Sequence, residues 1–365
     1  MNPRPQNIEV NPKAMHRHKA IVLGAGGLVG QRLQQRLVNH PMFEIAAVAG
    51  SPSSAGRQLS EIAWRLDEPR PALPEMVVVD SNAENLSELC RSMNIEYAFS
   101  ALPSSIATDV EKALVNAGIT VFSNASSYRR VQSVPLLIPE INPQHYHESR
   151  HYCATNCTLI PLVLPVAALA KATEIRSVKM RSEQALSGAG WSLLFDQDAL
   201  AGRVNPSIEG EAEKTAAEFL HVMGECSNQL VTPAGMDVEI HCERVARPNG
   251  HQVFVELVTS QPLNHDQIIE AFRMLGLGGE LPSRPNQAIH LVEQIDVDRH
   301  LWSDGTSFND DPDPSEDLKT GMAVVVGNLS VNGCEISFSA YSHNTVRGAA
   351  GGVVYLAEFV LANTS

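Results

Sequence analysis

The sequence predicts an α/β protein with two sheets, the first parallel and the second mixed or antiparallel. Short apolar strands alternate with helices over the first 156 residues, which is typical of a parallel sheet wound on both faces. After about Cys157, strand-like segments dominate instead. A chain of 365 residues exceeds one average domain, so we expect two domains.

The first part of the chain is interpreted from buried apolar runs separated by turns and amphipathic helices. A strand runs into a glycine-rich turn, and the turn opens a helix. The small polar run from Ser100 to Ser105 follows another strand and leads into a second helix. The expected strands cover 19–24, 44–49, 76–79, 96–101 and 120–123, and the expected helices cover 28–39 and 106–117.

The second part contains more strands than helices. The stretch 302–319 is acidic and turn-rich, which predicts a surface loop. The last segment, 345–361, predicts a helix that is apolar on one side. The expected strands cover 176–182, 237–244, 252–259, 322–329 and 335–341, and the other expected helices cover 159–172, 207–224 and 265–275.

Composition excludes several classes of function. The formal net charge is −14 and no basic run is present, so we expect no nucleic-acid partner. No window reaches the roughly 18 uninterrupted apolar residues of a membrane helix. The six cysteines lack metal-ligand spacing, so we expect neither a metal site nor disulfides. The polar N-terminus lacks the apolar core of a signal peptide, which predicts a flexible lead-in over 1–18 and a cytoplasmic enzyme.

Glycines open the first predicted helix directly after a strand. Gly24, Gly27 and Gly30 lie in this turn. Glycine allows a tight turn and lets backbone N–H groups approach a pyrophosphate at the positive end of a helix. The pattern therefore favours a dinucleotide site, with an ordinary structural turn as the alternative.

The loop after the second predicted strand favours NADP over NAD. An acidic residue at this place would bind a free ribose hydroxyl. The chain has Ser51, Ser54 and Arg57 instead. A guanidinium matches the geometry of a phosphate, so hydroxyls beside an arginine suit the 2′-phosphate of NADP. The alternative is an ordinary serine-rich loop.

Cys157 immediately precedes the predicted helix that begins near Leu159. A helix N-terminus lowers the pKa of a thiol, which favours a nucleophilic thiolate; the alternative is a buried small residue. Gln184 enters a glycine loop that can bring its amide close to a substrate carbonyl. Arg244 and His251 lie seven residues apart across a turn-forming segment, where an isolated histidine is usually a solvated turn residue.

Glu211 and Lys214 lie three residues apart on a predicted helix and therefore share one face. The residues alone favour a surface ion pair, worth a few tenths of a kcal/mol. A pair of substrate-binding groups is the alternative.

Taken together, these segments resemble the aspartate-semialdehyde dehydrogenase family, in particular its archaeal and fungal-like branch. The resemblance runs from about Lys19 to Ala362, nearly the whole chain. The spacings from Asn156-Cys157 to Gln184 and from Arg244 to His251 agree with the family. The other matching segments are GAGGLVG at 24–30, SNAS at 123–126 with Tyr128-Arg129 shortly after, VPLLIPEIN at 134–142, and residues 344–350.

The resemblance implies a role for each matching residue. Cys157 is the nucleophile, His251 the general acid/base, and Gln184 positions the substrate. Arg244 binds the substrate carboxylate, Glu211 its amino group, and Arg129 and Lys214 attract phosphate. Asn156 joins the catalytic group, and Ser51, Ser54 and Arg57 meet the NADP phosphate. The remaining expected cofactor contacts are Gly24, Gly26, Gly27, Leu28, Val29, Ser100, Ser187, Gly188 and Asn344.

The implied fold is a Rossmann-like NADP-binding domain over 19–156, completed by 345–365, and an α+β catalytic and dimerisation domain over 157–344. A homodimer or homotetramer acting on a small-molecule substrate and inorganic phosphate is expected. The chain departs from the family at Ala154-Thr155, Glu183, Arg247 and Gln252, which bears on the acyl substrate. A malonyl-CoA or N-acetylglutamyl-phosphate reductase type of enzyme, or a non-catalytic paralogue serving as a binding subunit, are the alternatives.

Overall fold

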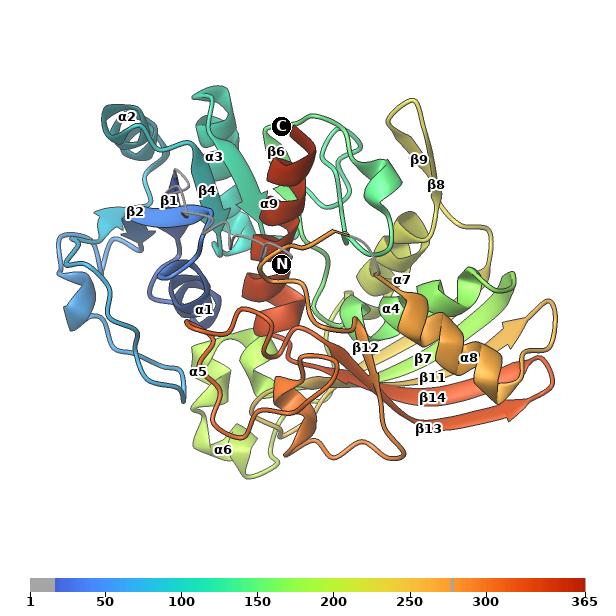
Figure 1. Ribbon diagram of the computed structural model, residues 1–365. Helices are drawn as coiled ribbons and strands as arrows, with labels where there is room; N and C mark the ends of the chain where they lie inside the picture. Colours follow the sequence, from blue (N-terminus) through green and yellow to red (C-terminus); the bar gives the residue numbers. More distant parts are fainter. Residues whose placement is uncertain (1–16, 277–278, 365) are drawn as a thin grey trace, which may run out of the picture.

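A computed structural model describes residues 17–276 and 279–364. It contains two six-stranded sheets, with helix α9 (Gly351–Thr364) standing between the region of β1–β6 and the region of β7–β14 (Figure 1). Residues 1–16 of the expected lead-in lie outside the described residues. Strand β1 begins at His18, within the range expected for the lead-in. Within the described part, no helix is long and apolar enough to cross a membrane.

The first sheet is parallel throughout and has the strand order β3-β2-β1-β4-β5-β6. Ala20 and Val22 of β1 face a core shared with α1 and α9, whereas Ile21 and Leu23 face a core shared with α2 and α3. Alternate residues of a strand point to opposite faces, so helices cover both. The elements are β1 (His18–Leu23), α1 (Leu28–Leu37), β2 (Phe43–Gly50), β3 (Val79–Asp80), α2 (Ala83–Met93), β4 (Tyr97–Ser100), α3 (Ser104–Asn116), β5 (Thr120–Ser123) and β6 (His151–Cys153).

Two elements of this sheet domain were missed by the sequence analysis, and one is shorter than predicted. Helix α2 begins after Asn82, whose side chain accepts a hydrogen bond from the Glu84 N–H, an N-cap that the sequence displays. Strand β6 is three residues long and carries no pattern of its own. The strand predicted at 76–79 shrinks to β3, because Val77 pairs with Gln58 instead.

The second sheet is mixed, which confirms the expectation from the strand-rich second part. Its order is β10-β7-β11-β14-β13-β12, with antiparallel pairs in the centre and a parallel pair at each edge. Helices α4, α7 and α8 lie over one face of it (Figure 1). The elements are α4 (Leu159–Ala170), β7 (Ile175–Gln184), α5 (Trp191–Leu194), α6 (Gln197–Leu200), α7 (Glu211–Val222), β8 (Glu225–Ser227), β9 (Leu230–Thr232), β10 (Asp237–Arg244), β11 (His251–Thr259), α8 (His265–Met274), β12 (Ile289–Leu291), β13 (Val324–Asn332) and β14 (Glu335–Ser342).

Helix α7 begins four residues later than the prediction from Ser207. Ser207 forms a bridge to Glu243 beside β10, and Gly210 precedes the helix with a left-handed φ of +65°. Glycine adopts this conformation without the steric cost that other residues meet. The delayed start makes Glu211 the first residue of the helix.

The C-terminal segment returns to the first sheet. Residues Val346–Ala350 form a single π-helical turn that continues into α9. The sequence predicted a helix with one apolar side, but α9 is buried nearly all round. It packs against the first sheet and α1, and Tyr355 joins a separate cluster with Met322 and Trp302. The domain boundaries expected at 156/157 and 344/345 stay a prediction.

Candidate active site

Cys157 and His251 meet although 94 residues separate them in the chain. Cys157 lies in the turn between β6 and α4, and His251 is the first, fully buried residue of β11. Cys157 Sγ is 3.3 Å from His251 Nε2, within hydrogen-bonding distance for sulfur. The two side chains therefore have the geometry of a nucleophile beside an acid/base group.

Backbone contacts select the tautomer of His251. The Ala185 N–H donates to His251 Nδ1 at 3.1 Å, so a neutral ring carries its proton on Nε2, facing the sulfur. Burial, and after it the charges of Arg244 and Arg247, lower the pKa of His251 to about 3. The ring is therefore neutral at physiological pH, with Nε2–H directed at Cys157.

The Cys157 thiol differs from the sequence-based expectation. Burial and the Glu211 carboxylate raise the pKa of Cys157 to about 11, against the opposing effect of Arg129 and Arg244. The sequence predicted a lowered pKa from the helix N-terminus. Helix α4 begins at Leu159, as expected. Loss of solvent and a nearby carboxylate raise the pKa of the thiol more than the helix end lowers it.

Asn156 is held by helix α7 from two sides. Its Nδ2 donates to Glu211 Oε1 at 2.7 Å, and its backbone N–H donates to Glu218 Oε2, also at 2.7 Å. Gln184 reaches the same Glu211 oxygen at 3.4 Å. The structure therefore brings together Asn156, Gln184 and Glu211, and it adds Glu218, which the sequence analysis missed.

Arg244 ends β10 beside the Cys157–His251 pair. Its Nη1 donates to Ala185 O at 2.7 Å. A Cβ at Gly188 would lie 2.9 Å from Arg244 Nη1 and 3.1 Å from His251 Nε2, so a side chain there would force the two groups to move. The glycine is needed for this close approach, which places the loop after β7 against the reacting groups.

Arg129 approaches the nucleophile loop from the first sheet. Its Nη1 pairs with Glu218 Oε1 at 3.2 Å, and its Nη2 donates to Asn124 O at 2.6 Å. Its Nε is buried and has no hydrogen-bond partner among the described residues. Lys214 is exposed on α7, and no described contact ties it to the nucleophile loop.

The π-helical turn before α9 supplies a contact that the sequence analysis did not assign. A Cβ at Gly348 would lie 2.7 Å from Cys157 Cβ and 3.0 Å from Cys157 Cα. The small-residue run from Gly348 to Gly352 was the available signal. π-Helical turns are frequent at functional sites, and this one packs directly behind the nucleophile.

The glycine turn lies at the carboxyl edge of the first sheet, between β1 and β4, where the strand order reverses. Gly24 has a φ of +81°, and a Cβ there would lie 2.6 Å from Ala101 O. Gly27 caps α1 without a side-chain hydrogen bond. Dinucleotides bind at such switch points, which suits the expected contacts at Gly26, Leu28 and Val29.

The other expected cofactor residues lie at separate parts of this edge. Ser51 Oγ is 2.9 Å from Ser53 Oγ and 3.3 Å from Ser54 Oγ, so three hydroxyl-bearing residues gather after β2. Arg57 follows them on the same exposed loop but donates to Glu61 O at 2.8 Å. Ser100 ends β4, and its Oγ is buried without a partner.

Asn344 connects the loop after β7 to the start of β11. Its Nδ2 donates to Ser187 Oγ at 2.9 Å, and its Oδ1 accepts from the Gly250 N–H at 2.8 Å. Because Gly250 precedes His251 and Ser187 precedes Gly188, this amide fixes the backbone on both sides of the imidazole. Ser187 and Asn344 are thus joined to each other beside His251, and the cofactor contacts expected of them stay a prediction.

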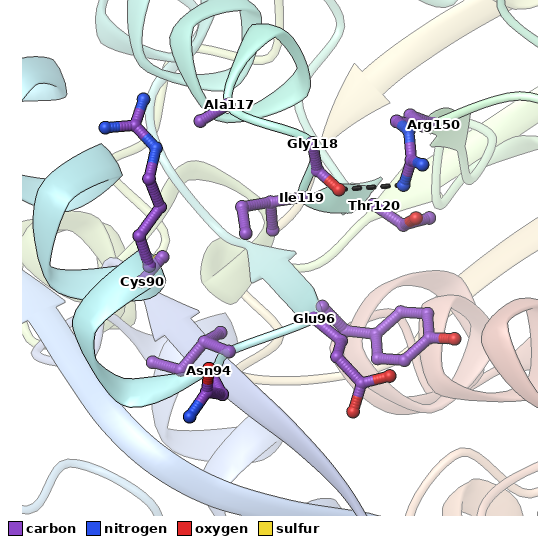
Figure 2. Close-up of a pocket in the computed structure, with 11 residues that line it drawn as sticks. Cys90, Asn94, Glu96, Ala117, Gly118, Ile119, Thr120 and Arg150 are labelled. Carbon is purple, nitrogen blue, oxygen red and sulfur yellow. Dashed lines mark hydrogen bonds between the residues drawn. The ribbon is translucent and has the colours of Figure 1, made fainter.

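A cavity of about 430 Å³ lies at the opposite edge of the first sheet (Figure 2). It is lined by the starts of β4 and β5, including Glu96 and Thr120, and Arg150 donates to Gly118 O there at 2.7 Å. Neither Cys157 nor His251 lines it. The Cys157–His251 pair therefore lies outside this cavity.

This chain is similar in sequence to known proteins. Residues 19–149 match the family described as semialdehyde dehydrogenase, NAD binding domain. The chain is similar to the aspartate-semialdehyde dehydrogenase of Archaeoglobus fulgidus, with 32% identity covering 94% of this chain and 98% of the relative. The chain belongs to the aspartate-semialdehyde dehydrogenase family.

Two further relatives place the family assignment in the branch that the sequence resembles. The aspartate-semialdehyde dehydrogenase of Methanothermobacter thermautotrophicus is 34% identical over 93% of this chain and 97% of the relative. The crystal structure of aspartate semialdehyde dehydrogenase with NADP from Candida albicans superposes with a TM-score of 0.75. It is 29% identical and covers 96% of this chain and 99% of that chain. One relative is archaeal and the other fungal, which confirms the resemblance drawn from the motifs.

Proposed function

We propose that this chain is an NADP-dependent aspartate-semialdehyde dehydrogenase. It interconverts L-aspartyl 4-phosphate and L-aspartate 4-semialdehyde, a step in the biosynthesis of lysine, threonine and methionine. The observation that carries the proposal is the 3.3 Å contact between Cys157 Sγ and His251 Nε2, with carboxylate and guanidinium groups around the same loop. Family membership supports the substrate pair.

The residues present suit NADP. The glycine turn leads into α1 at the point where the strand order reverses, and Ser51 and Ser54 present hydroxyls after β2. Gly24, Gly26, Gly27, Leu28 and Val29 would lie under the pyrophosphate, with Arg57 near the 2′-phosphate. NADP, when bound, accepts a hydride from the substrate carbon or returns it.

The protein's own groups account for the covalent chemistry. The Cys157 thiolate adds to the aldehyde carbon, and the carbonyl oxygen takes up a proton, which gives a hemithioacetal. The carbon then gives up a hydride while the hydroxyl proton passes to His251 Nε2, and a thioester remains. Phosphate held by Arg129 then attacks the resulting thioester, and the Cys157 sulfur leaves as the acyl phosphate forms. In the biosynthetic direction the same steps run in reverse.

Accepting a proton at Nε2 requires the His251 ring proton to move. The Ala185 N–H contact favours the Nε2–H tautomer in the ligand-free protein. The base step therefore needs Nε2 to release its own proton first, and the contact to Ala185 must change in the reacting complex. In the resting state, Nε2–H instead serves as a hydrogen-bond donor to a thiolate or an oxyanion.

Substrate specificity follows from opposite charges on either side of the nucleophile. Arg244 binds the substrate carboxylate, and Glu211 binds its amino group while Gln184 orients the reacting carbonyl. A malonyl-CoA reductase would need the arginine but not the amine-binding Glu211, whose Oε1 already faces Asn156 and Gln184. This carboxylate favours an amino-acid substrate, and the retained Cys157 and His251 disfavour a non-catalytic subunit.

A second copy of the chain is proposed to pack on the uncovered face of the second sheet. Strands β7, β10 and β11 present exposed charged side chains there, including Lys179, Arg181, Glu239 and Glu256. These residues alternate with more buried ones along each strand, so among the described residues they lie on the face opposite α4, α7 and α8. A homodimer or homotetramer in the cytoplasm is the assembly we propose, to be tested by sedimentation.

The experiment compares Cys157→Ala with Cys226→Ala, a partly exposed cysteine on β8. Reduction of NADP by aspartate semialdehyde should require phosphate in the parent and in Cys226→Ala. It should vanish in Cys157→Ala, which should still bind NADP. Coenzyme A in place of phosphate should not support turnover. Phosphate-dependent turnover by Cys157→Ala would rule out the covalent route.

A further inference from the structure

Helix α7 carries two carboxylates that accept hydrogen bonds from Asn156, the residue before the nucleophile. Glu211 and Glu218 are seven residues apart, so they lie on the same face of the helix. Glu211 bonds the side chain of Asn156, and Glu218 Oε2 accepts from the Asn156 backbone N–H at 2.7 Å. Because Asn156 immediately precedes Cys157, the Glu218 bond fixes the backbone on which the reacting sulfur is mounted.

Glu218 uses its second oxygen to bind Arg129. Glu218 Oε1 lies 3.2 Å from Arg129 Nη1, and the side chains are 4% and 11% exposed respectively. Although burial acts to lower it, pairing with Glu218 holds the pKa of Arg129 above its ordinary value. A carboxylate offers two acceptor oxygens, and here each serves a different element: Arg129 on one side and the Asn156 backbone on the other.

We propose that Glu218 is a positioning residue that couples the phosphate-binding arginine to the backbone of the nucleophile loop. The inference rests on the proposed function for the role of Arg129. Phosphate and Glu218 compete for the positive charge of Arg129, while Glu218 holds Asn156 and hence Cys157 in place. Binding of phosphate to Arg129 therefore changes how Glu218 holds Asn156, and with it the position of the Cys157 sulfur.

The competition between phosphate and Glu218 for Arg129 predicts an effect that a purely structural role of Glu218 does not predict. Removing the charge of Glu218 leaves Arg129 uncompensated beside both the phosphate site and Cys157. Arg129 already acts to lower the pKa of Cys157, so the thiol becomes more acidic when Glu218 is neutral. Phosphate should bind more tightly at the same time, while turnover falls because the loop has lost an anchor.

The test compares Glu218→Gln with Glu213→Gln, which makes the same charge change at an exposed position of α7. In Glu218→Gln an amide NH₂ replaces one of the two acceptor oxygens. We expect kcat to fall about tenfold or more, the phosphate KM to fall, and alkylation of Cys157 to shift to lower pH. Glu213→Gln should match the parent in all three.

Site-resolved alkylation separates this inference from the proposed function. Iodoacetamide labelling of Cys157, followed by peptide mass spectrometry, needs no turnover and reports the thiol directly. If the parent shows no phosphate-dependent turnover, the proposed function fails, and the alkylation shift alone decides on Glu218. An unchanged alkylation profile in folded Glu218→Gln overturns the inference. Where the parent is active, a kcat of Glu218→Gln within twofold of that of Glu213→Gln overturns it as well.

Glu218→Asp covers the case in which Glu218→Gln fails to fold. Aspartate keeps the charge and shortens the reach by one methylene, so it can retain Arg129 or the Asn156 N–H but not both. We expect kcat to fall with little change in the pH at which Cys157 is alkylated. Parent-like turnover by folded Glu218→Asp, judged by circular dichroism and thermal melting, would contradict the positioning role.

Discussion

Replacing Gly348 by alanine should displace the nucleophile through a steric clash, without changing any charge. The new Cβ would lie 2.7 Å from Cys157 Cβ and 3.0 Å from Cys157 Cα. Carbon atoms pack best at about 3.5–4.0 Å, so the two backbones must separate by roughly 1 Å. Gly348 does not have a positive φ, so the substitution adds a steric clash and no backbone strain.

The magnitude follows from the tolerance of catalytic geometry. A misplacement of about 1 Å can cost about 100-fold in rate. Overpacking costs about 1–3 kcal/mol of stability, partly offset by the better helix propensity of alanine, about 1 kcal/mol. The variant should therefore fold, bind NADP normally and lose about 100-fold in kcat.

The assay is phosphate-dependent NADP reduction beside a thermal melt, with Gly235→Ala as the matched control. A Cβ at Gly235 meets no atom within 4 Å, so this variant makes the same chemical change in open space. Parent-like kcat in folded Gly348→Ala, equal to that of Gly235→Ala, would refute the packing of the π-helical turn behind Cys157.

Three other outcomes follow from the charges and contacts of the site. Glu211→Gln removes a carboxylate that raises the pKa of Cys157, so iodoacetamide should label Cys157 at a lower pH than in the parent. Arg57→Ala should raise the KM for NADP about tenfold, because one contact with the 2′-phosphate is lost. The KM for NAD should not change, and steady-state kinetics with both cofactors would measure the two values. The buried His251 has its pKa lowered from an ordinary 6.5 to about 3, so the unfolded protein binds its proton first as the pH falls. Stability should therefore decline between pH 6.5 and 3, and His251→Asn should flatten this part of a denaturation series; an unchanged slope would contradict burial of a neutral ring.

The sequence predicted most of the architecture because both sheets leave a pattern in it. The glycine turn followed by an amphipathic helix indicated β1 and α1, and the strand-rich second part indicated the mixed sheet. Strand β6 was not predicted because three residues are too short to show a period. The burial of α9 was underestimated because elements distant in the chain enclose it. Contacts between distant elements decide such segments.

The candidate site was predictable where chemistry-bearing residues occur in family-like spacing. Cys157, His251, Gln184 and Glu211 do come together, whereas Lys214 stays exposed. Glu218 escaped because an acidic residue on an amphipathic helix normally faces solvent, and only the fold reveals its two buried partners. The pKa of Cys157 was predicted in the wrong direction, because burial and the Glu211 carboxylate depend on tertiary packing.

Trapping the acyl enzyme tests the account at its centre. Aspartate semialdehyde and NADP, mixed without phosphate and quenched in acid, should leave an aspartyl group on the peptide that contains Cys157. One NADPH should form for each aspartyl group, up to one of each per chain. Adding phosphate should discharge the aspartyl group. Phosphate-dependent turnover with no acyl group on Cys157, or with the group on another cysteine, would contradict a reaction that proceeds through the sulfur facing His251.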